Sequence, residues 1–348
     1  MPRYGLYRAA FEALALPGVA PMLRRVSQAK GVIFTLHRVL SEPPAAFAPN
    51  AILQVKPDFL EAVIVRARRA GFDIVDLDEA AKRLTEMDAR PFVVLTFDDG
   101  YRDNLVHALP ILRRHDAPFT LYLPTALVDS VGMVWWQALE DIIAVNTLVV
   151  VDLPEGPHYG DATTLEQKNR TFAYVYDRYR KMPEPEREAS IRALAGRYGF
   201  DLAAHCRGLI MDWNELKAFA DEPLCTIGAH TVHHFELSKL PEAEMRAEIE
   251  QSAKVLGAQF GTRPRHLSYP IGGAAAAGPR EFAAARELGF VTAVTTRPGG
   301  LYADHAAHLN ALPRISLNGL FQERRFIDVF LTAEIFTFMR RGRRLDIA

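Results

Sequence analysis

The chain is poor in the features that define several large classes of protein. Its 348 residues include only two cysteines, Cys206 and Cys225, so it cannot build a disulfide framework, and neither cysteine has a partner at metal-binding spacing. There is no run of about 18 apolar residues, so no membrane-spanning helix is predicted. With a net charge of −1 and no basic stripe interleaved with aromatic residues, nucleic-acid binding is not expected.

A glycine-rich phosphate loop and a well-formed secretory signal are missing as well. Gly272 and Gly273 precede a run of alanines and lack both the Gly-x-Gly-x-x-Gly pattern and a P-loop lysine. Near the N-terminus an apolar stretch follows two arginines, but Glu12 interrupts it and Pro17 comes soon after, so a signal-peptide core is poorly formed. The sequence therefore favours the cytoplasm.

What is present is enough apolar sequence for a large core. Hydrophobic residues make up 49% and charged residues 24% of the chain, as in folded globular proteins. Apolar runs predict strands at 32–36, 93–97, 120–123, 226–229, 266–269, 291–295 and 312–316, with a shorter one at 72–75. Helices are predicted between them at 58–70, 104–115, 242–260 and 279–288. This alternation predicts an α/β barrel of parallel strands in one elaborated domain, since barrel enzymes of about 250 residues or more are commonly one domain.

Two adjacent carboxylates end the strand predicted at 93–97, in the segment TFDDG at 96–100. Like charges this close raise each other's pKa and are costly unless a cation or a proton transfer requires them. Side chains alternate across a strand, so Asp98 and Asp99 share one pocket only if the chain turns, which Gly100 permits. The alternative is that both cap a helix beginning near Asp103, because aspartate is favoured at helix starts.

A second polar cluster follows the strand predicted at 226–229. His230 ends that strand and His234 follows four residues later, a spacing that puts both imidazoles on one side of a helical turn. A catalytic zinc site keeps three nitrogen or oxygen ligands and one open position, a count that one aspartate and two histidines meet. His233 is an alternative ligand, and a polar surface turn without metal is the other interpretation.

Together these two segments resemble the first two motifs of the polysaccharide deacetylase family, the carbohydrate esterase group that includes the rhizobial chitooligosaccharide deacetylases. Three further segments are similar to the same family: TLHRV at 35–39, LSYPIG at 267–272 and LPRIS at 312–316. The resemblance spans about residues 30–318 and implies a distorted (β/α) barrel, often of seven strands. The chain then divides into an N-terminal helical extension (1–29), the barrel (30–318) and a C-terminal basic amphipathic helix (319–348).

The resemblance also implies roles for individual residues. Asp99, His230 and His234 would hold a divalent metal, with zinc the expected ion, and Asp98 would act as general base. A bound divalent cation lowers the pKa of its water to about 7, and the resulting oxyanion would be stabilised by a backbone N–H near Tyr269. Residue chemistry alone allows Tyr269 to be a packed side chain beside a rigid proline turn instead.

The general acid that protonates the leaving amine is the least defined of these roles. In the family a histidine usually follows a leucine near the last strand, and this sequence has none there. The candidates are His305 and His308, for which surface-loop residues are the alternative interpretation, and His37, which closes an early strand at the same barrel end as Asp98. Arg314, which is always charged, is expected to hold Asp98 in place or to contact substrate.

Two regions lie outside the barrel pattern. Residues 128–222 are interpreted as a helical insertion without a core of its own, in which Trp135 and Trp136 could stack on sugar rings, although burial is expected for at least one. Residues 320–339 look helical and apolar and end in a cluster of arginines. Arginines at a helix C-terminus are favoured by the helix dipole, and a basic amphipathic end can also rest on an anionic membrane surface.

The sequence thus predicts a metal-dependent hydrolase that removes N-acetyl groups from an amino-sugar oligomer, polysaccharide or lipid-linked saccharide during cell-surface glycan synthesis. It would work in the cytoplasm or at the periphery of the inner membrane. Two alternatives stay open: a hydrolase of small cyclic or linear amides on the same barrel, and a non-catalytic glycan-binding protein, which the missing late histidine keeps in consideration.

Overall fold

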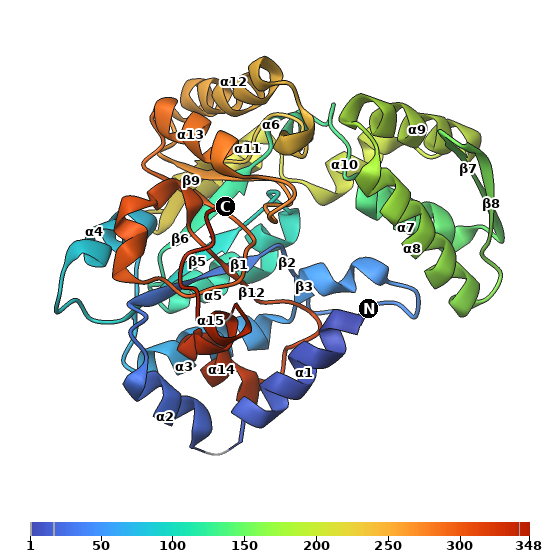
Figure 1. Ribbon diagram of the computed structural model, residues 1–348. Coiled ribbons are helices and arrows are strands. Elements are labelled where there is room, and N and C mark those ends of the chain that lie inside the picture. Colours follow the sequence, from blue (N-terminus) through green and yellow to red (C-terminus); the bar gives the residue numbers. More distant parts are fainter. Residues whose placement is uncertain (1, 17, 341) are drawn as a thin grey trace.

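The core of the molecule is one curved sheet of parallel strands (Figure 1). The computed structural model describes residues 2–16, 18–340 and 342–348. A short strand, β4 (Asp73–Ile74), pairs with the start of β5, and a parallel bridge between Val294 and Leu312 links the two ends of the sheet. The distorted barrel of about seven parallel strands is therefore confirmed. Its main strands lie in the order β11 (Thr292–Val294), β10 (His266–Ser268), β9 (Cys225–Ala229), β6 (Phe119–Leu123), β5 (Phe92–Phe97), β1 (Gly31–Leu36) and β12 (Ile315–Ser316).

The two central strands fix the geometry of the site. β1 and β5 are buried at every position, as expected for parallel strands covered on both faces. They pair in register from Gly31 opposite Phe92 to Leu36 opposite Phe97. Because the strands end level with each other, His37 and Asp98 leave the sheet at the same edge.

Helices surround the barrel and mostly match the predicted segments. In α3 (Pro57–Arg69) a proline occupies the first turn, and α12 (Glu242–Phe260) ends at Gly261 with φ 76°, the usual signals for helix starts and stops. The helix predicted at 104–115 starts as a wider π-helical segment, Asn104–Ala108, and continues as α5 (Leu109–Arg114), because Pro110 lacks the N–H of a regular helical bond. The remaining barrel helices are α4 (Leu77–Thr85), α11 (Trp213–Ala220) and α13 (Pro279–Glu287).

The last predicted strand, 312–316, is divided between two neighbours. Leu312 exchanges backbone hydrogen bonds with β11, donating to the Ala293 carbonyl oxygen at 3.0 Å. Only Ile315–Ser316 pairs with β1. Pro313 has no N–H to continue a ladder, so the chain changes partner at this residue, and β12 is shorter than predicted.

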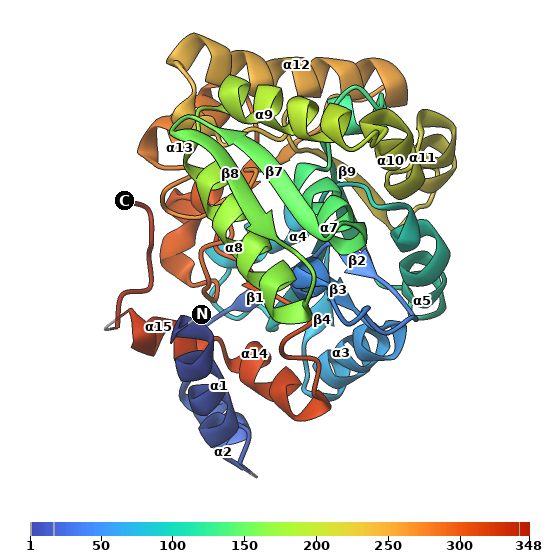
Figure 2. The same ribbon diagram turned by 90° about the vertical axis from the view of Figure 1, so that its right-hand side faces the viewer.

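The segment between β6 and β9 forms a lobe beside the barrel (Figure 1). An antiparallel hairpin, β7 (Leu148–Leu153) and β8 (Gly156–Asp161), was not predicted, and Figure 2 shows it facing the viewer. It forms because Val149 and Val151 bury one face of β7. The buried side chains of the lobe belong to the same apolar cluster as the barrel. Its helices are α7 (Trp135–Val145), α8 (Leu165–Lys181), α9 (Glu184–Arg197) and α10 (Leu202–Leu209). The short helix α6 (Thr125–Val128), which precedes them in the sequence, packs against α12 of the barrel (Figure 1).

The two ends of the chain pack together at one end of the molecule (Figures 1 and 2). The single helix predicted at 320–339 is wrong, because Ala333 adopts φ 55° and separates α14 (Ile327–Thr332) from α15 (Glu334–Met339). The N-terminal helices are α1 (Pro2–Leu14) and α2 (Val19–Val26). The ring centroids of Phe321, Phe326 and Phe330 lie 4.8–5.8 Å from that of Phe11 in α1. These apolar side chains therefore pack against α1 instead of facing outward. Contact with a membrane surface stays a prediction. Within the described residues no helix combines the length and apolar character needed to cross a bilayer.

Candidate active site

The predicted polar clusters meet at the carboxyl ends of the strands. Asp98 and Asp99 follow β5, and His230 follows β9. Asp99 and Gly100 both have φ 73°, so the chain turns there as expected and the two carboxylates do not follow the alternation of a strand. Neither aspartate caps the next helical segment: the residue preceding it is Asp103, which instead binds Arg38 and the backbone N–H of Val39.

The two histidines come together by a route that differs from the prediction. Residues 230–234 form an irregular loop, with bends at Val232 and His233, instead of a helical turn. Thr231 and His234 adopt φ 64° and 60°, a costly left-handed conformation for residues other than glycine. These bends bring the ring centroids of His230 and His234 to 4.9 Å. His233 turns away and binds Glu248 at 2.6 Å, a hydrogen bond that raises its pKa, so the alternative ligand is not in the cluster.

Asp99, His230 and His234 place three ligand atoms within 4.8 Å of one another, and all three side chains are buried. Nε2 of His230 lies 3.6 Å from Oδ1 of Asp99, and Nε2 of His234 lies 3.4 Å from the same oxygen. Donors held about 2.0–2.2 Å from one tetrahedral ion are roughly 3.3–3.6 Å apart. The spacing therefore suits a divalent cation.

Hydrogen bonding around this triad leaves the ligand atoms available. Nδ1 of His230 lies 2.7 Å from the Ser268 carbonyl oxygen, to which it must donate, so Nε2 carries the lone pair that a metal requires. Oδ1 of Asp99 is buried and receives no hydrogen bond within the described part of the chain. Burial and the nearby Asp98 charge raise the pKa of Asp99, and burial lowers the pKa of both histidines. A cation would satisfy Asp99 in its ionised form.

The second carboxylate has a different environment. Arg314 binds Asp98 through two parallel hydrogen bonds of 2.8 and 2.7 Å, and both side chains are buried. Burial alone would raise the pKa of Asp98, but the charge and hydrogen bonds of Arg314, together with the nearby His230 and His37, outweigh it, and the pKa falls far below its usual range. Arg314 also binds the hydroxyls of Thr96 and Ser268. Arg314 was expected either to hold Asp98 in place or to contact substrate, and the structure pairs it with Asp98. This pairing keeps Asp98 ionised.

A cavity of about 240 Å³ opens over these groups. Trp135 and Trp136 line it while being only 4% and 6% exposed. The Trp136 ring lies 5.0 Å from that of His234, so one wall of the cavity is aromatic. The other lining residues are His37, Asn50, Ile52, Leu53, Asp98, Asp99, Tyr176, Arg180, His230, His234, Ile271 and Thr296.

The remaining predicted residues do not reach this cavity. The Tyr269 hydroxyl donates to the Asn310 carbonyl oxygen at 2.9 Å, and its backbone N–H donates to Val294 within the sheet. The expectation that Tyr269 supplies a backbone donor to an oxyanion is therefore contradicted, because the donor is already used. His305 follows Leu301, which pairs with Gly31 at the start of β1, so His305 and His308 lie toward the opposite end of the barrel. Of the three candidate acids only His37 lines the cavity.

The buried His305 is expected to make the fold sensitive to acid. Burial lowers its pKa to about 4, while an unfolded histidine titrates near about 6.5. Between these values the unfolded chain binds a proton that the folded chain does not, so stability falls as the pH drops, by up to about 3 kcal/mol. Chemical denaturation at pH 7 and pH 4.5 should show a smaller loss in H305Q than in the wild type. H308Q should keep the wild-type loss, and an H305Q variant that keeps it too would contradict this assignment.

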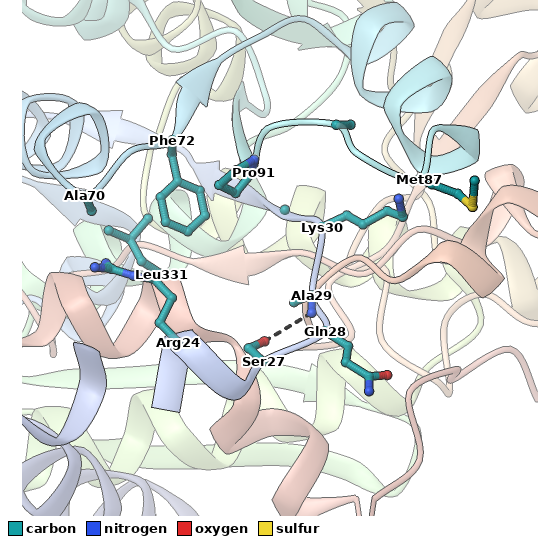
Figure 3. A pocket seen from close by; sticks show the side chains of 12 residues that line it. Arg24, Ser27, Gln28, Ala29, Lys30, Ala70, Phe72, Met87, Pro91 and Leu331 are labelled. Atoms are coloured by element: carbon teal, nitrogen blue, oxygen red, sulfur yellow. Dashed lines mark hydrogen bonds between the residues drawn. The ribbon is translucent and has the colours of Figure 1, made fainter. Parts of the chain in front are cut away.

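A second cavity, of about 280 Å³, lies at the other end of the barrel. Figure 3 shows it lined by Ser27, Gln28, Ala29 and Lys30, which precede β1. Its charged lining residues are Arg24 and Lys30, and no carboxylate, histidine or cysteine belongs to its described lining. It therefore lacks the acid–base groups found in the first cavity.

Several residues of the site were missed by the sequence analysis. Ser268 touches both Asp98 and Arg314 and orients His230; its place in the segment at 267–272, beside a predicted strand end, was a usable signal. Asn50 donates to the Trp136 carbonyl oxygen at 2.8 Å and so joins the lobe to the barrel. Asn50 and Arg180 also line the cavity, but nothing in the sequence around either residue indicated this position.

Comparison with known proteins agrees with the geometry. The family model described as polysaccharide deacetylase matches residues 86–293. Over 270 residues the chain is 30% identical to the Bacillus subtilis (strain 168) protein YxkH, whose name assigns it to the polysaccharide deacetylases; the alignment covers 75% of this chain and 67% of YxkH. The chain belongs to the polysaccharide deacetylase family.

Solved structures share the fold of this deacetylase. The Streptococcus pyogenes deacetylase PplD in complex with acetate superposes with a TM-score of 0.56 at 19% identity, over 84% of this chain and 94% of PplD. IcaB from Ammonifex degensii gives a TM-score of 0.53 at 17% identity, over 87% of this chain and 98% of IcaB. At these identities the likeness shows the common barrel and nothing finer.

Proposed function

We propose that this deacetylase hydrolyses the N-acetyl group of an amino sugar in an oligomer or polysaccharide, with a divalent metal held by Asp99, His230 and His234. The observation that carries the proposal is the pairing of two adjacent carboxylates with different partners. Asp98 is satisfied by Arg314, whereas Asp99 faces two histidine nitrogens and pairs with no arginine or lysine among the described residues. Such a division suits one carboxylate for proton transfer and the other for metal binding.

A bound zinc or similar ion would activate water and polarise the acetyl carbonyl. Asp98, ionised because Arg314 holds it, takes a proton from the attacking water. Burial lowers the pKa of His37 to about 4, so His37 is neutral near pH 7 and carries no spare proton. The proton needed by the leaving nitrogen therefore originates in the attacking water, and His37 can relay it from Asp98 as the C–N bond breaks.

The walls of the cavity support a sugar substrate. Trp135, Trp136 and Tyr176 supply aromatic surface next to the triad, and aromatic rings offer an apolar face with a polar edge. The cell-surface role of the product glycan and the choice of zinc also belong to this proposal.

Acetate release from chitooligosaccharides or a related acetylated glycan tests the function. We expect release that a chelator abolishes and that D98N reduces by about 10²- to 10⁴-fold, the usual contribution of a general base. H308Q, altered outside the cavity, should keep wild-type turnover. Full activity in D98N would refute the assigned base, and sugar binding without any release would favour a glycan-binding protein. Turnover of a ureide or imide but of no acetylated sugar would favour an amide hydrolase.

A further inference from the structure

A network of charged side chains joins the lobe to the barrel next to the catalytic cavity. Glu236, which follows β9, binds Arg180 at 2.9 Å and Lys239 at 2.9 Å and lies 4.0 Å from Arg187. Glu184 pairs with Arg187 and lies 3.7 Å from Lys239. Glu184, Arg187 and Glu236 are each no more than 3% exposed. Because these charges are withdrawn from water, they interact strongly with one another.

The network carries one more positive than negative charge. It contains the cations Arg180, Arg187 and Lys239 and the carboxylates Glu184 and Glu236. The fully buried members, Glu184, Arg187 and Glu236, carry one excess negative charge, and the side chains of Arg180 and Lys239, which offset it, are 28% and 19% exposed. The excess positive charge of the network therefore lies on its accessible side, where an anion can pair with it. The structure indicates where that anion would bind, because Arg180 is the network member that lines the cavity.

Arg180 is held firmly but is not saturated. Its Nε and Nη2 donate to the two oxygens of Glu236 at 2.9 and 3.1 Å. The Arg180 guanidinium also contacts the Tyr176 hydroxyl, but a guanidinium has five N–H donors, so donors remain for a ligand. Arg314, which lies behind Asp98, is fully buried and uses all of its donors on Asp98, Thr96, Ser268 and the Thr295 carbonyl oxygen. Arg180 is therefore the fixed positive charge that the cavity can offer to a ligand.

We propose that Arg180 recognises an oxyanion on the glycan, a carboxylate or a phosphate, so that the substrate is an anionic acetylated amino sugar. The inference rests on the proposed function and narrows its substrate class. The planar fork of arginine fits carboxylate and phosphate oxygens through paired hydrogen bonds. In this arrangement Glu236 fixes the guanidinium so that little side-chain entropy is lost when the anion binds.

The test compares neutral and anionic substrates in matched variants. The probes are chitobiose fully N-acetylated, an N-acetylglucosamine–glucuronic acid disaccharide, and N-acetylglucosamine 1-phosphate. The wild type should prefer at least one anionic probe in kcat/KM, and R180Q should reduce that preference at least about tenfold, with R180K restoring part of it. K181Q removes the same charge from the next residue, which is 66% exposed and pairs with Asp177, and should keep the wild-type preference.

The two anionic probes separate a carboxylate from a phosphate ligand. An R180Q preference equal to that of the wild type would overturn the inference while leaving the proposed function intact. If no probe releases acetate, the proposed function fails, and calorimetric binding of the same three sugars to the metal-loaded protein still decides the inference. Melting curves verify that R180Q folds. If R180Q does not fold, the preference for anionic probes is compared between R180K and K181Q instead.

Discussion

Replacing Arg314 with methionine is expected to lower the free energy of unfolding by about 3–5 kcal/mol, because Asp98 is then left buried without its cation. The same change should reduce deacetylation by at least about 100-fold, since the base is no longer held ionised. Both effects follow from a guanidinium that is fully buried and binds both oxygens of Asp98. Urea denaturation and acetate release measure them.

The double variant D98N/R314M distinguishes a coupled pair from two independent contacts. Removing both charges leaves no buried ion, so the double variant should be less destabilised than the sum of D98N and R314M. R325M is the control, because Arg325 pairs with Glu12 on the surface with 49% of its side chain exposed, and such pairs contribute about 1 kcal/mol or less. Strictly additive losses in the double variant would show that the pair does not act as a unit.

Asp99→Asn is expected to weaken divalent-metal binding by at least about 100-fold, more than the loss of an outer-shell partner usually costs. With zinc at 100 times its dissociation constant, the wild type should gain about 2.7 kcal/mol of stability and D99N almost none. Without metal the order should change: D99N should be at least as stable as the wild type, because it removes a buried carboxylate that has no donor on Oδ1.

Metal content after dialysis and denaturation with and without a chelator measure this prediction. H233Q is the matched control, because His233 lies beside the ligands in sequence but binds Glu248, and it should retain metal. A D99N protein that keeps its metal, or an H233Q protein that loses it, would refute the assigned triad.

The strands and the polar residues that end them could be predicted because their signals are local. β1 and β5 are continuous apolar runs ending in polar residues, and parallel strands place those ends at one edge. This brought Asp98, Asp99, His230 and His37 together without knowledge of the loops. The hairpin β7–β8 was missed because its alternation is short and lies inside a segment that otherwise looks helical.

The candidate residues that do not reach the cavity share one physical cause. The sequence analysis chose Tyr269, His305 and His308 as candidate site residues by residue type and by their order along the chain. Whether a backbone N–H is free, and whether a side chain lies near the cavity, depends on how the strands pair across the sheet. Tyr269 loses its backbone N–H to Val294, a residue 25 positions later in the sequence, and His305 is fixed near the start of β1 by the pairing of Leu301 with Gly31. Neither contact has a local sequence signal.

The sequence by itself predicted the barrel and the meeting of Asp98, Asp99 and His230 at one edge of the sheet, because alternating strands and helices and the polar residues that end the strands are signals within short segments. The roles of metal ligand and base came from the resemblance to the family and stay predictions. Only the tertiary structure decided that Arg314 neutralises Asp98, that His37 alone of the three candidate acids lines the cavity, and that a lobe residue, Arg180, joins its wall. These features depend on contacts between segments tens to hundreds of residues apart, whose free energies arise from burial and charge pairing that no single segment contains.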